Sequence, residues 1–134
     1  MGVMQYEKKA TIVIADDDKI LLDIVRVALR SELYQVIGEA HNGQDAITKC
    51  KTLKPDLLLL DINMPKMDGF QALEAILKLA PAPIVLMMSG DATMDNVNTA
   101  IKKGAAGFLV KPFNSASVLD TVRDALKNNK RIEL

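Results

Sequence analysis

Leu57-Leu58-Leu59-Leu60-Asp61 is the most apolar run in this chain, and it leads directly into the stretch Ile62-Asn63-Met64-Pro65-Lys66-Met67-Asp68-Gly69. Four consecutive leucines without polar alternation are typical of a strand that is buried on both faces, as in a parallel sheet. Asp61 closes this run, at the point where turn-forming residues commonly end a strand. We therefore expect a carboxylate at the edge of a sheet, fixed at its base and exposed at its tip, where it can react.

Similar apolar runs recur along the chain and alternate with stretches of helical periodicity, which is the pattern of β-α units around a parallel sheet. The sequence predicts five strands, over residues 11–15, 34–39, 56–60, 84–88 and 106–110. It predicts five helices, over residues 19–31, from Gly43 to the proline at 55, over 70–79, from Met94 to Gly104, and around Val118, Val122 and Leu126. Helical spacing assigns to the buried faces the residues Leu21, Ile24, Val25, Ala28 and Met94.

The bulk composition is that of a globular protein. A length of 134 residues predicts one domain, residues 1–134, with a core from about residue 11 to 128 and a short extension at each end. Seventeen acidic and seventeen basic side chains balance, so this chain alone is not expected to bind nucleic acid or a membrane surface. Cys50 is the only cysteine, which excludes an internal disulfide, and the N-terminus has no secretory signal. We expect a cytoplasmic protein.

Four polar residues stand at the ends of four predicted strands: Asp17, Asp61, Ser89 and Lys111. Their separations of 44, 28 and 22 residues are close to whole numbers of β-α units. The carboxyl ends of parallel strands meet at one edge of a sheet, and open α/β sheets bind their ligands there. We therefore expect a single site at this edge. The second strand offers nothing comparable, which suggests a place at the border of the sheet.

The expected site is strongly acidic. Asp16 precedes Asp17, so with Asp61 three carboxylates would meet and repel one another unless a cation compensates them. Mg²⁺ is the natural candidate, because it prefers oxygen ligands and no imidazole or thiolate occurs in the motif. Lys111 would supply a fixed positive charge, and Ser89 a hydroxyl donor. Together these groups indicate phosphoryl transfer to an aspartate, with an acyl phosphate as the product.

Four motifs give the chain a family resemblance. They are Ala15-Asp16-Asp17-Asp18, Asp61-Ile62-Asn63-Met64-Pro65-Lys66-Met67-Asp68-Gly69, Met88-Ser89-Gly90 and Gly107-Phe108-Leu109-Val110-Lys111-Pro112-Phe113. In this order and at these separations they resemble the receiver (CheY-like) domain of bacterial two-component response regulators, from about Thr11 to Asn128. The resemblance implies a doubly wound, flavodoxin-like α/β fold, with a five-stranded parallel sheet in the order 2-1-3-4-5 and five helices in a three-layer sandwich.

The resemblance also assigns roles to the acidic residues. It implies that Asp61 is the phosphoacceptor, and that its donor is a sensor histidine kinase, a phosphotransfer protein or a small phosphodonor. Asp17, Asp61 and the backbone carbonyl of Asn63 would bind Mg²⁺ directly, with Asp16 acting through water. Asn63 and Asp91 would flank the path of a hydrolytic water, and we hypothesise that this pair permits fairly quick self-dephosphorylation.

A conformational switch is implied as well. Lys111 and the Ser89 hydroxyl would contact the phosphoryl group, and Ser89 would move inward once that group is bound. Phe108 stands at the family's switch position, which is often tyrosine, so the switch would work here through packing alone. An unknown downstream protein would detect the change on the face built from the fourth helix, the fifth strand and the fifth helix. A cis peptide bond is implied between Lys111 and Pro112.

Two acidic residues near the site have simpler explanations. Asp18 is expected to cap the first helix, because a carboxylate at that position accepts hydrogen bonds from free backbone N–H groups. Asp68 is expected to cap the third helix or to shape the turn before it. We leave both residues out of the candidate site.

Three functions remain open. The leading one is a stand-alone receiver, which is no enzyme beyond its own phosphorylation and dephosphorylation and which signals by changing its protein partners. The second is the receiver part of a longer regulator, for example a DNA-binding one. The third is a Mg²⁺-dependent aspartyl phosphohydrolase, a class that usually carries a second acid where this chain has Asn63 and a cap domain for which there is no room.

Overall fold

The computed structural model describes residues 9–129 and contains the five strands and five helices that the sequence predicts. The strands are β1 (Thr11–Ala15), β2 (Gln35–Ala40), β3 (Leu57–Asp61), β4 (Ile84–Ser89) and β5 (Gly107–Val110). The helices are α1 (Lys19–Ser31), α2 (Gly43–Leu53), α3 (Gly69–Leu77), α4 (Met94–Lys102) and α5 (Ser115–Asn128). For most helices and strands the predicted and observed ends differ by no more than one or two residues, which is the usual uncertainty in where such an element ends.

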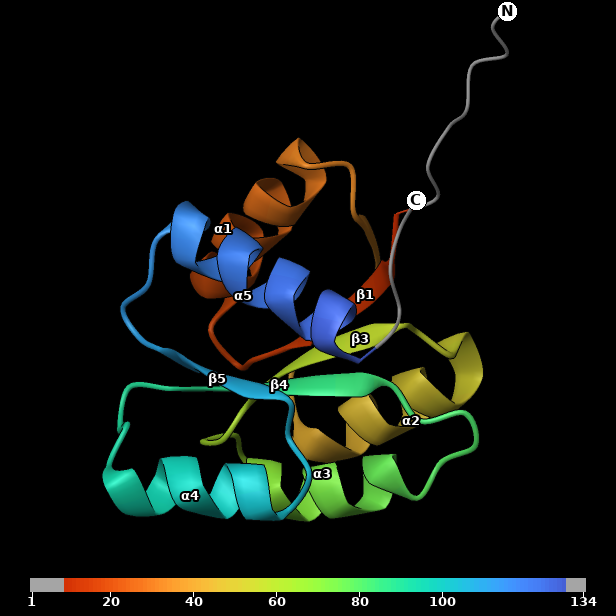
Figure 1. Ribbon diagram of the computed structural model, residues 1–134. Coiled ribbons are helices and arrows are strands. Elements are labelled where there is room, and N and C mark those ends of the chain that lie inside the picture. The colour runs from red at the N-terminus through yellow and green to blue at the C-terminus, as the bar shows by residue number, and fades with distance from the viewer. Residues whose placement is uncertain (1–8, 130–134) are drawn as a thin grey trace, which may run out of the picture.

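The sheet is parallel throughout, in the order β2-β1-β3-β4-β5, which confirms the predicted doubly wound fold. β2 forms one border, as expected. Figure 1 shows α1 and α5 together on one face of the sheet and α2, α3 and α4 on the other. The order reverses between β1 and β3, so the loops after these two strands diverge to opposite faces and leave a crevice at their carboxyl ends.

The central strand β3 explains why the chain folds this way. All five of its residues are buried, and alternate side chains enter different cores. Leu57 and Leu59 pack with residues of α1 and α5, whereas Leu58 and Leu60 pack with residues of α2, α3 and α4. Each fully buried leucine stabilises the fold by roughly 1.5–3 kcal/mol relative to an exposed one. The run of four leucines thus joins both layers of helices to one sheet.

Polar side chains fix the start of every helix in the described part of the chain. The N-cap residues are Asp18, Asn42, Asp68, Thr93 and Asn114, and each accepts a hydrogen bond from a backbone N–H in the first turn. The predictions for Asp18 and Asp68 are confirmed, and Asp68 forms a complete capping box with Gln71. These caps determine where each loop at the carboxyl edge of the sheet ends.

The buried face of α1 differs from the prediction. Ile24 was expected to face the core but is 51% exposed, whereas Leu22 and Leu29 are buried beside Val25 and Ala28. The apolar residues of this helix cover more than half of its circumference, so periodicity alone does not choose which of them are buried. Packing against β1 and α5 decides the orientation, and it leaves Ile20, Ile24 and Val27 in solvent.

Met94 was also expected in the core, and this expectation is wrong. It lies at the start of α4 and is 75% exposed. Ile101 lies two turns further along on the same side of the helix and is exposed as well. Ala100 is the buried residue of this helix. A small alanine lets α4 lie close to the sheet, so the larger side chains point outward.

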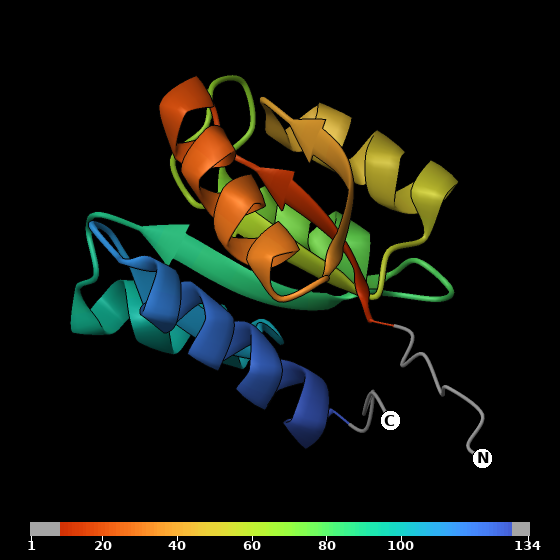
Figure 2. The ribbon, with the colours of Figure 1, turned by 90° about the horizontal axis from the view of Figure 1, so that it is seen from above.

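Figure 2 shows the arrowheads of β1 and β4 pointing to the same end of the molecule, where the loop that follows β3 projects. Three of the four residues singled out by their spacing are the last residues of a strand or directly follow one: Asp61, Ser89 and Lys111. The fold therefore brings these side chains to one edge, as the sequence predicts.

Candidate functional site

Three carboxylates meet at the carboxyl edge of the sheet, where the sequence placed them. Asp16, Asp17 and Asp61 each offer an oxygen, and these oxygens lie within 4.8 Å of one another. Asp16 is held by its backbone N–H, which donates to the carbonyl of Ala40, and by its Oδ1, which accepts from the N–H of Asp18 at 2.9 Å. The helix cap at Asp18 thus also orients the neighbouring site residue.

Lys111 compensates part of this negative charge. Its Nζ lies 2.6 Å from Oδ2 of Asp16, a carboxylate with no exposed surface, and 3.3 Å from Oδ1 of Asp61. Lys111 is fixed to the neighbouring strand because its backbone N–H donates to the carbonyl of Ser89. A charged carboxylate is costly to bury without a partner, so this ion pair permits Asp16 to be buried. The fixed positive charge that the sequence assigned to Lys111 thus lies against two carboxylates.

Burial raises the pKa of Asp61 to about 6, and the negative charge of Asp16 contributes to the rise. The charge and hydrogen bond of Lys111, and a hydrogen bond from the backbone of Asn63, oppose it. Burial also disfavours the charged form of Lys111, but its bonds to Asp16 and Asp61 outweigh this and raise the pKa of the amine. Lys111 therefore stays cationic, and Asp61 is mostly ionised at neutral pH.

The expectation that Asp61 is exposed at its tip is wrong, because the residue is only 2% exposed. The loop after β3 folds back against the backbone at the end of its own strand, with Ile62 and Met64 buried in the core. Gly69, which the sequence reading assigned no role, permits this close approach. A Cβ at Gly69 would lie 2.5 Å from the backbone carbonyl oxygen of Asp61. Its position at the first turn of α3, directly after a cap residue, is the signal that could have indicated a close backbone contact.

Ser89 is buried, and its hydroxyl is engaged in the structure. Oγ accepts a hydrogen bond from the N–H of Asp91 at 2.9 Å and lies 3.5 Å from Nδ2 of Asn63, a distance at the upper limit for a hydrogen bond. Phe108 is half-buried and packs against the core on the side of α2, α3 and α4. The hydroxyl and the aromatic ring thus lie on neighbouring strands, and Met87 pairs with Phe108 in the register of β4 and β5.

The cis peptide bond that the resemblance implies between Lys111 and Pro112 is present. A second one, between Ala80 and Pro81, was not predicted. Asn63 and Asp91 are both exposed beside the site, as side chains that border a path for water would be.

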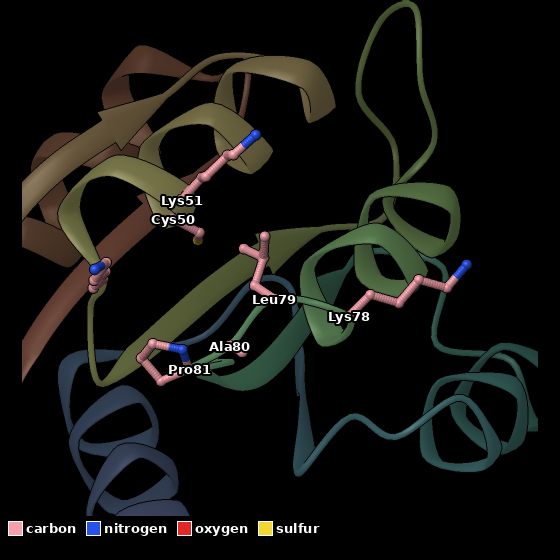
Figure 3. A pocket seen from close by; sticks show the side chains of 7 residues that line it. Cys50, Lys51, Lys78, Leu79, Ala80 and Pro81 are labelled. Carbon is pink, nitrogen blue, oxygen red and sulfur yellow. The ribbon is translucent and has the colours of Figure 1, made fainter.

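A cavity of about 320 Å³ lies away from this site, at the end of α2 and the connection from α3 to β4. Its lining residues are Cys50, Lys51, Lys54, Lys78, Leu79, Ala80 and Pro81. Figure 3 shows that the side chain of Lys78 points away from the hollow. Burial raises the pKa of the Cys50 thiol to about 12, so this cysteine stays protonated and is no nucleophile. The cavity borders the amino ends of β3 and β4, and so contributes nothing to the acidic site.

The acidic cluster has the chemistry of a site for a hard divalent cation. Three carboxylates face one ammonium group, so one or more negative charges remain uncompensated among these four side chains. All of the available ligand atoms are oxygens, and Asp17 is exposed, which leaves a route for an ion and its water to enter. The residues present therefore fit a metal ion of the Mg²⁺ type.

Within the described part of the chain, no helix is long and apolar enough to cross a membrane.

Comparisons with known proteins agree with this geometry. The family model of the response regulator receiver domain matches residues 12–123. The chemotaxis protein CheY of Listeria monocytogenes is 38% identical over 116 residues, which cover 87% of this chain and 98% of that protein. The signal receiver domain of NarL from Mycobacterium tuberculosis superposes with a TM-score of 0.83 at 35% identity, covering 90% of this chain and 98% of that one. The CheX-CheY-BeF3-Mg complex from Borrelia burgdorferi contains a chain that superposes with a TM-score of 0.83 at 32% identity, covering 87% and 88%.

Proposed function

Because this chain belongs to the response regulator receiver family, we propose that it is a phosphorylation switch in which Asp61 accepts a phosphoryl group in the presence of Mg²⁺. The observation that carries the proposal is the set of groups around Asp61. A buried carboxylate, two neighbouring carboxylates and the ammonium of Lys111 meet at the edge where Ser89 also ends its strand.

In the proposed reaction, a carboxylate oxygen of Asp61 attacks the phosphorus of a phosphohistidine or of a small acyl phosphate. A bond from oxygen to phosphorus forms, the bond from phosphorus to the donor breaks, and the leaving group keeps the electron pair. Asp61 needs no base, because a pKa of about 6 leaves it mostly ionised at neutral pH. Lys111 would neutralise charge on the phosphoryl oxygens, since its amine already lies 3.3 Å from Asp61.

Mg²⁺, when bound, would neutralise negative charge on the carboxylates and on the transferred group. Asp17, Asp61 and the backbone carbonyl of Asn63 would hold it, with Asp16 acting through water because its Oδ2 is occupied by Lys111. The exposed position of Asp17 supports its place among the direct ligands. With the metal bound, the charges of the three carboxylates and Lys111 would be balanced before the phosphoryl group arrives, and the cluster would carry about one negative charge after it.

We propose that the result of phosphorylation is detected on α4, β5 and α5. Met94 and Ile101 of α4 and Val110 of β5 are large apolar side chains that stand exposed on adjacent elements. Scattered exposed apolar residues are ordinary, but a group of them beside a mobile switch favours a protein partner. Phe108, two residues before Val110 on the same face of β5, would connect this surface to the core.

The proposed protein is a stand-alone, cytoplasmic receiver that acts on no substrate other than its own phosphoryl group. The near-complete coverage of the Listeria CheY protein supports the stand-alone form. The hydrolase alternative has less in its favour, because Asn63 occupies the position where that class usually carries a second acid.

The proposed function is tested by intact mass spectrometry after incubation with acetyl phosphate and Mg²⁺. We expect the wild-type chain to gain one phosphoryl group, and the Asp61→Asn variant to gain none. Chelation of Mg²⁺ should prevent labelling of the wild type. An unlabelled wild type, under conditions where a known receiver is labelled, would refute the proposal.

A protein donor should need the exposed apolar stripe of α1. Ile20, Ile24 and Val27 recur at positions i, i+4 and i+7, and α1 begins directly after the acidic loop. A donor whose phosphohistidine reaches Asp61 would cover this end of the helix. We expect Ile24→Asp to slow phosphotransfer from a histidine kinase about tenfold or more, because it places a charge in an apolar contact.

The matched control is Ile101→Asp, since Ile101 is 50% exposed and lies on α4. It should leave phosphotransfer from the kinase unchanged, and neither variant should alter labelling by acetyl phosphate. Equal rates for wild type and Ile24→Asp with the kinase would remove α1 from the donor surface.

A further inference from the structure

A chain of hydrogen bonds joins Ser89 to helix α4 through the loop between them. The N–H of Asp91 donates to the Ser89 hydroxyl at 2.9 Å, and the backbone carbonyl of Asp91 accepts from Nδ2 of Asn96 at 2.8 Å. Asn96 is itself fixed, because its own N–H donates to Oγ1 of the N-cap residue Thr93 at 3.1 Å. One residue of the loop, Asp91, is thus held from both sides.

The geometry makes the loop, and not the strand, the part that can move. The carbonyl of Ser89 accepts the N–H of Lys111, so the end of β4 is tied to the ladder with β5. A Ser89 hydroxyl that turns toward Asp61 must therefore carry the N–H of Asp91 with it or lose that hydrogen bond. In the first case the carbonyl of Asp91 shifts against Asn96, so the hydrogen bond from Asn96 resists the movement.

We propose that Asn96 is a positioning residue that holds the loop after β4 in its resting arrangement and so restrains the inward movement of Ser89. The inference rests on the proposed function and adds to it the group that sets the balance between resting and phosphorylated forms. Coupling of this kind is reciprocal, so whatever draws Ser89 inward also loosens the hold of Asn96 on the first turn of α4.

The test measures affinity for beryllium trifluoride, a mimic of the phosphoryl group, at fixed Mg²⁺ concentration by amide NMR titration. Loss of one hydrogen bond that stabilises the resting form should tighten binding by about fivefold in Asn96→Ala. Asn96→Asp should behave in the same way, because it lacks the donor. An acid in the first turn stabilises a helix, so loosening of α4 cannot explain that result.

Two further variants separate positioning from a general structural effect. Asn98→Ala changes an exposed asparagine of the same helix, whose side chain makes no hydrogen bond within residues 9–129, and should leave the affinity unchanged. In a Ser89→Ala background there is no hydroxyl to restrain, so Asn96→Ala should then have no effect.

Wild-type affinity in Asn96→Ala, or a gain that persists in the Ser89→Ala background, would overturn the role of Asn96 while leaving the proposed function intact. Failure of the wild type to bind the mimic at all would refute the proposed function and this inference together. The two failures are therefore distinguishable in one set of titrations.

Discussion

Replacing Lys111 with methionine is expected to lower the free energy of unfolding by about 3–5 kcal/mol at pH 7 without Mg²⁺, and to slow phosphorylation of Asp61 about a hundredfold. Asp16 has no exposed surface, and its carboxylate lies 2.6 Å from the Lys111 amine. Methionine keeps the length of the side chain but leaves two carboxylates facing each other without a cation. The substitution thus leaves a buried charge without a partner, which destabilises the fold far more than the loss of an exposed ion pair would.

The destabilisation should depend on conditions that supply positive charge. Mg²⁺ should restore part of the stability, because a cation at the cluster takes over the compensation. Lowering the pH toward 5 should also reduce the difference, since Asp61, with a pKa of about 6 in the wild type, then binds a proton. Urea denaturation of both proteins at pH 7 and pH 5, with and without Mg²⁺, measures the difference in the free energy of unfolding under all four conditions.

The matched control is Lys102→Met on α4. Lys102 is an exposed lysine with no ion pair among the described residues, so its loss should change the free energy of unfolding by less than about 0.5 kcal/mol. A Lys111→Met variant as stable as this control would mean that the ion pair with Asp16 contributes little, and would weaken the assignment of Lys111 to the site.

The sequence predicted the edge of the sheet better than the faces of its helices. Strands buried on both sides need continuous apolar residues, and β3 and β4 have them up to their last residues, Asp61 and Ser89. Once the strands are known and parallel, the residues that follow them must share an edge. The meeting of Asp16, Asp61 and Lys111 was therefore predictable from the spacing of residues at strand ends. These residues lie far apart in the sequence, and only the fold brings them together.

Helix orientation could not be obtained in the same way. α1 has apolar residues on most of its surface, and Ile24 and Leu29 are equally hydrophobic, yet one is exposed and the other is not. The choice depends on the positions of β1 and α5, which lie far apart in the sequence. Met94 was misplaced for a related reason, since Ala100 makes the close contact of α4. Exposed apolar residues on both helices are consistent with surfaces that bind other proteins.

The burial of Asp61 was missed because it depends on side chains that only the fold brings beside it, among them Asp16 and Lys111, and on the path of the loop that follows β3. The N–H of Gly69 donates to the carbonyl of Ile62 at 2.7 Å, which closes the loop tightly against the end of β3. Turn-forming residues indicated a loop, but composition does not determine how far a loop folds back. The consequence is physical, because burial is the main cause of the raised pKa of Asp61.

Asp61→Asn is expected to stabilise the protein by about 3 kcal/mol at pH 7 without Mg²⁺. The carboxyl has an ordinary pKa of 3.8, which burial and the charge of Asp16 raise to about 6. A raised pKa means that the folded chain binds this proton more tightly than the unfolded chain does. The ionised form is therefore the one that disfavours folding, and asparagine, which has a similar size and no charge, removes this cost.

The sign of the pH dependence follows directly. The contribution of Asp61 to the free energy of unfolding of the wild type is most favourable below about pH 4. It falls as the pH rises from about 4 to 6 and is constant above about pH 6. The variant has no such window, so the difference between the two proteins should be close to zero at pH 4 and complete at pH 7. Chemical denaturation across this range measures it, with Asp124→Asn, an exposed acid on α5, as the control.

Mg²⁺ supplies the decisive comparison, because it should stabilise the wild type and reduce its deficit relative to Asp61→Asn. A difference that is equal at pH 4 and pH 7 would show that the variant acts through packing and not through charge. A variant less stable than the wild type at pH 7 would show that the attraction of Lys111 outweighs burial. With the expected result, the carboxylate that the fold stabilises least is the one that a metal and a phosphoryl group would neutralise, so that phosphorylation relieves a cost built into the resting protein.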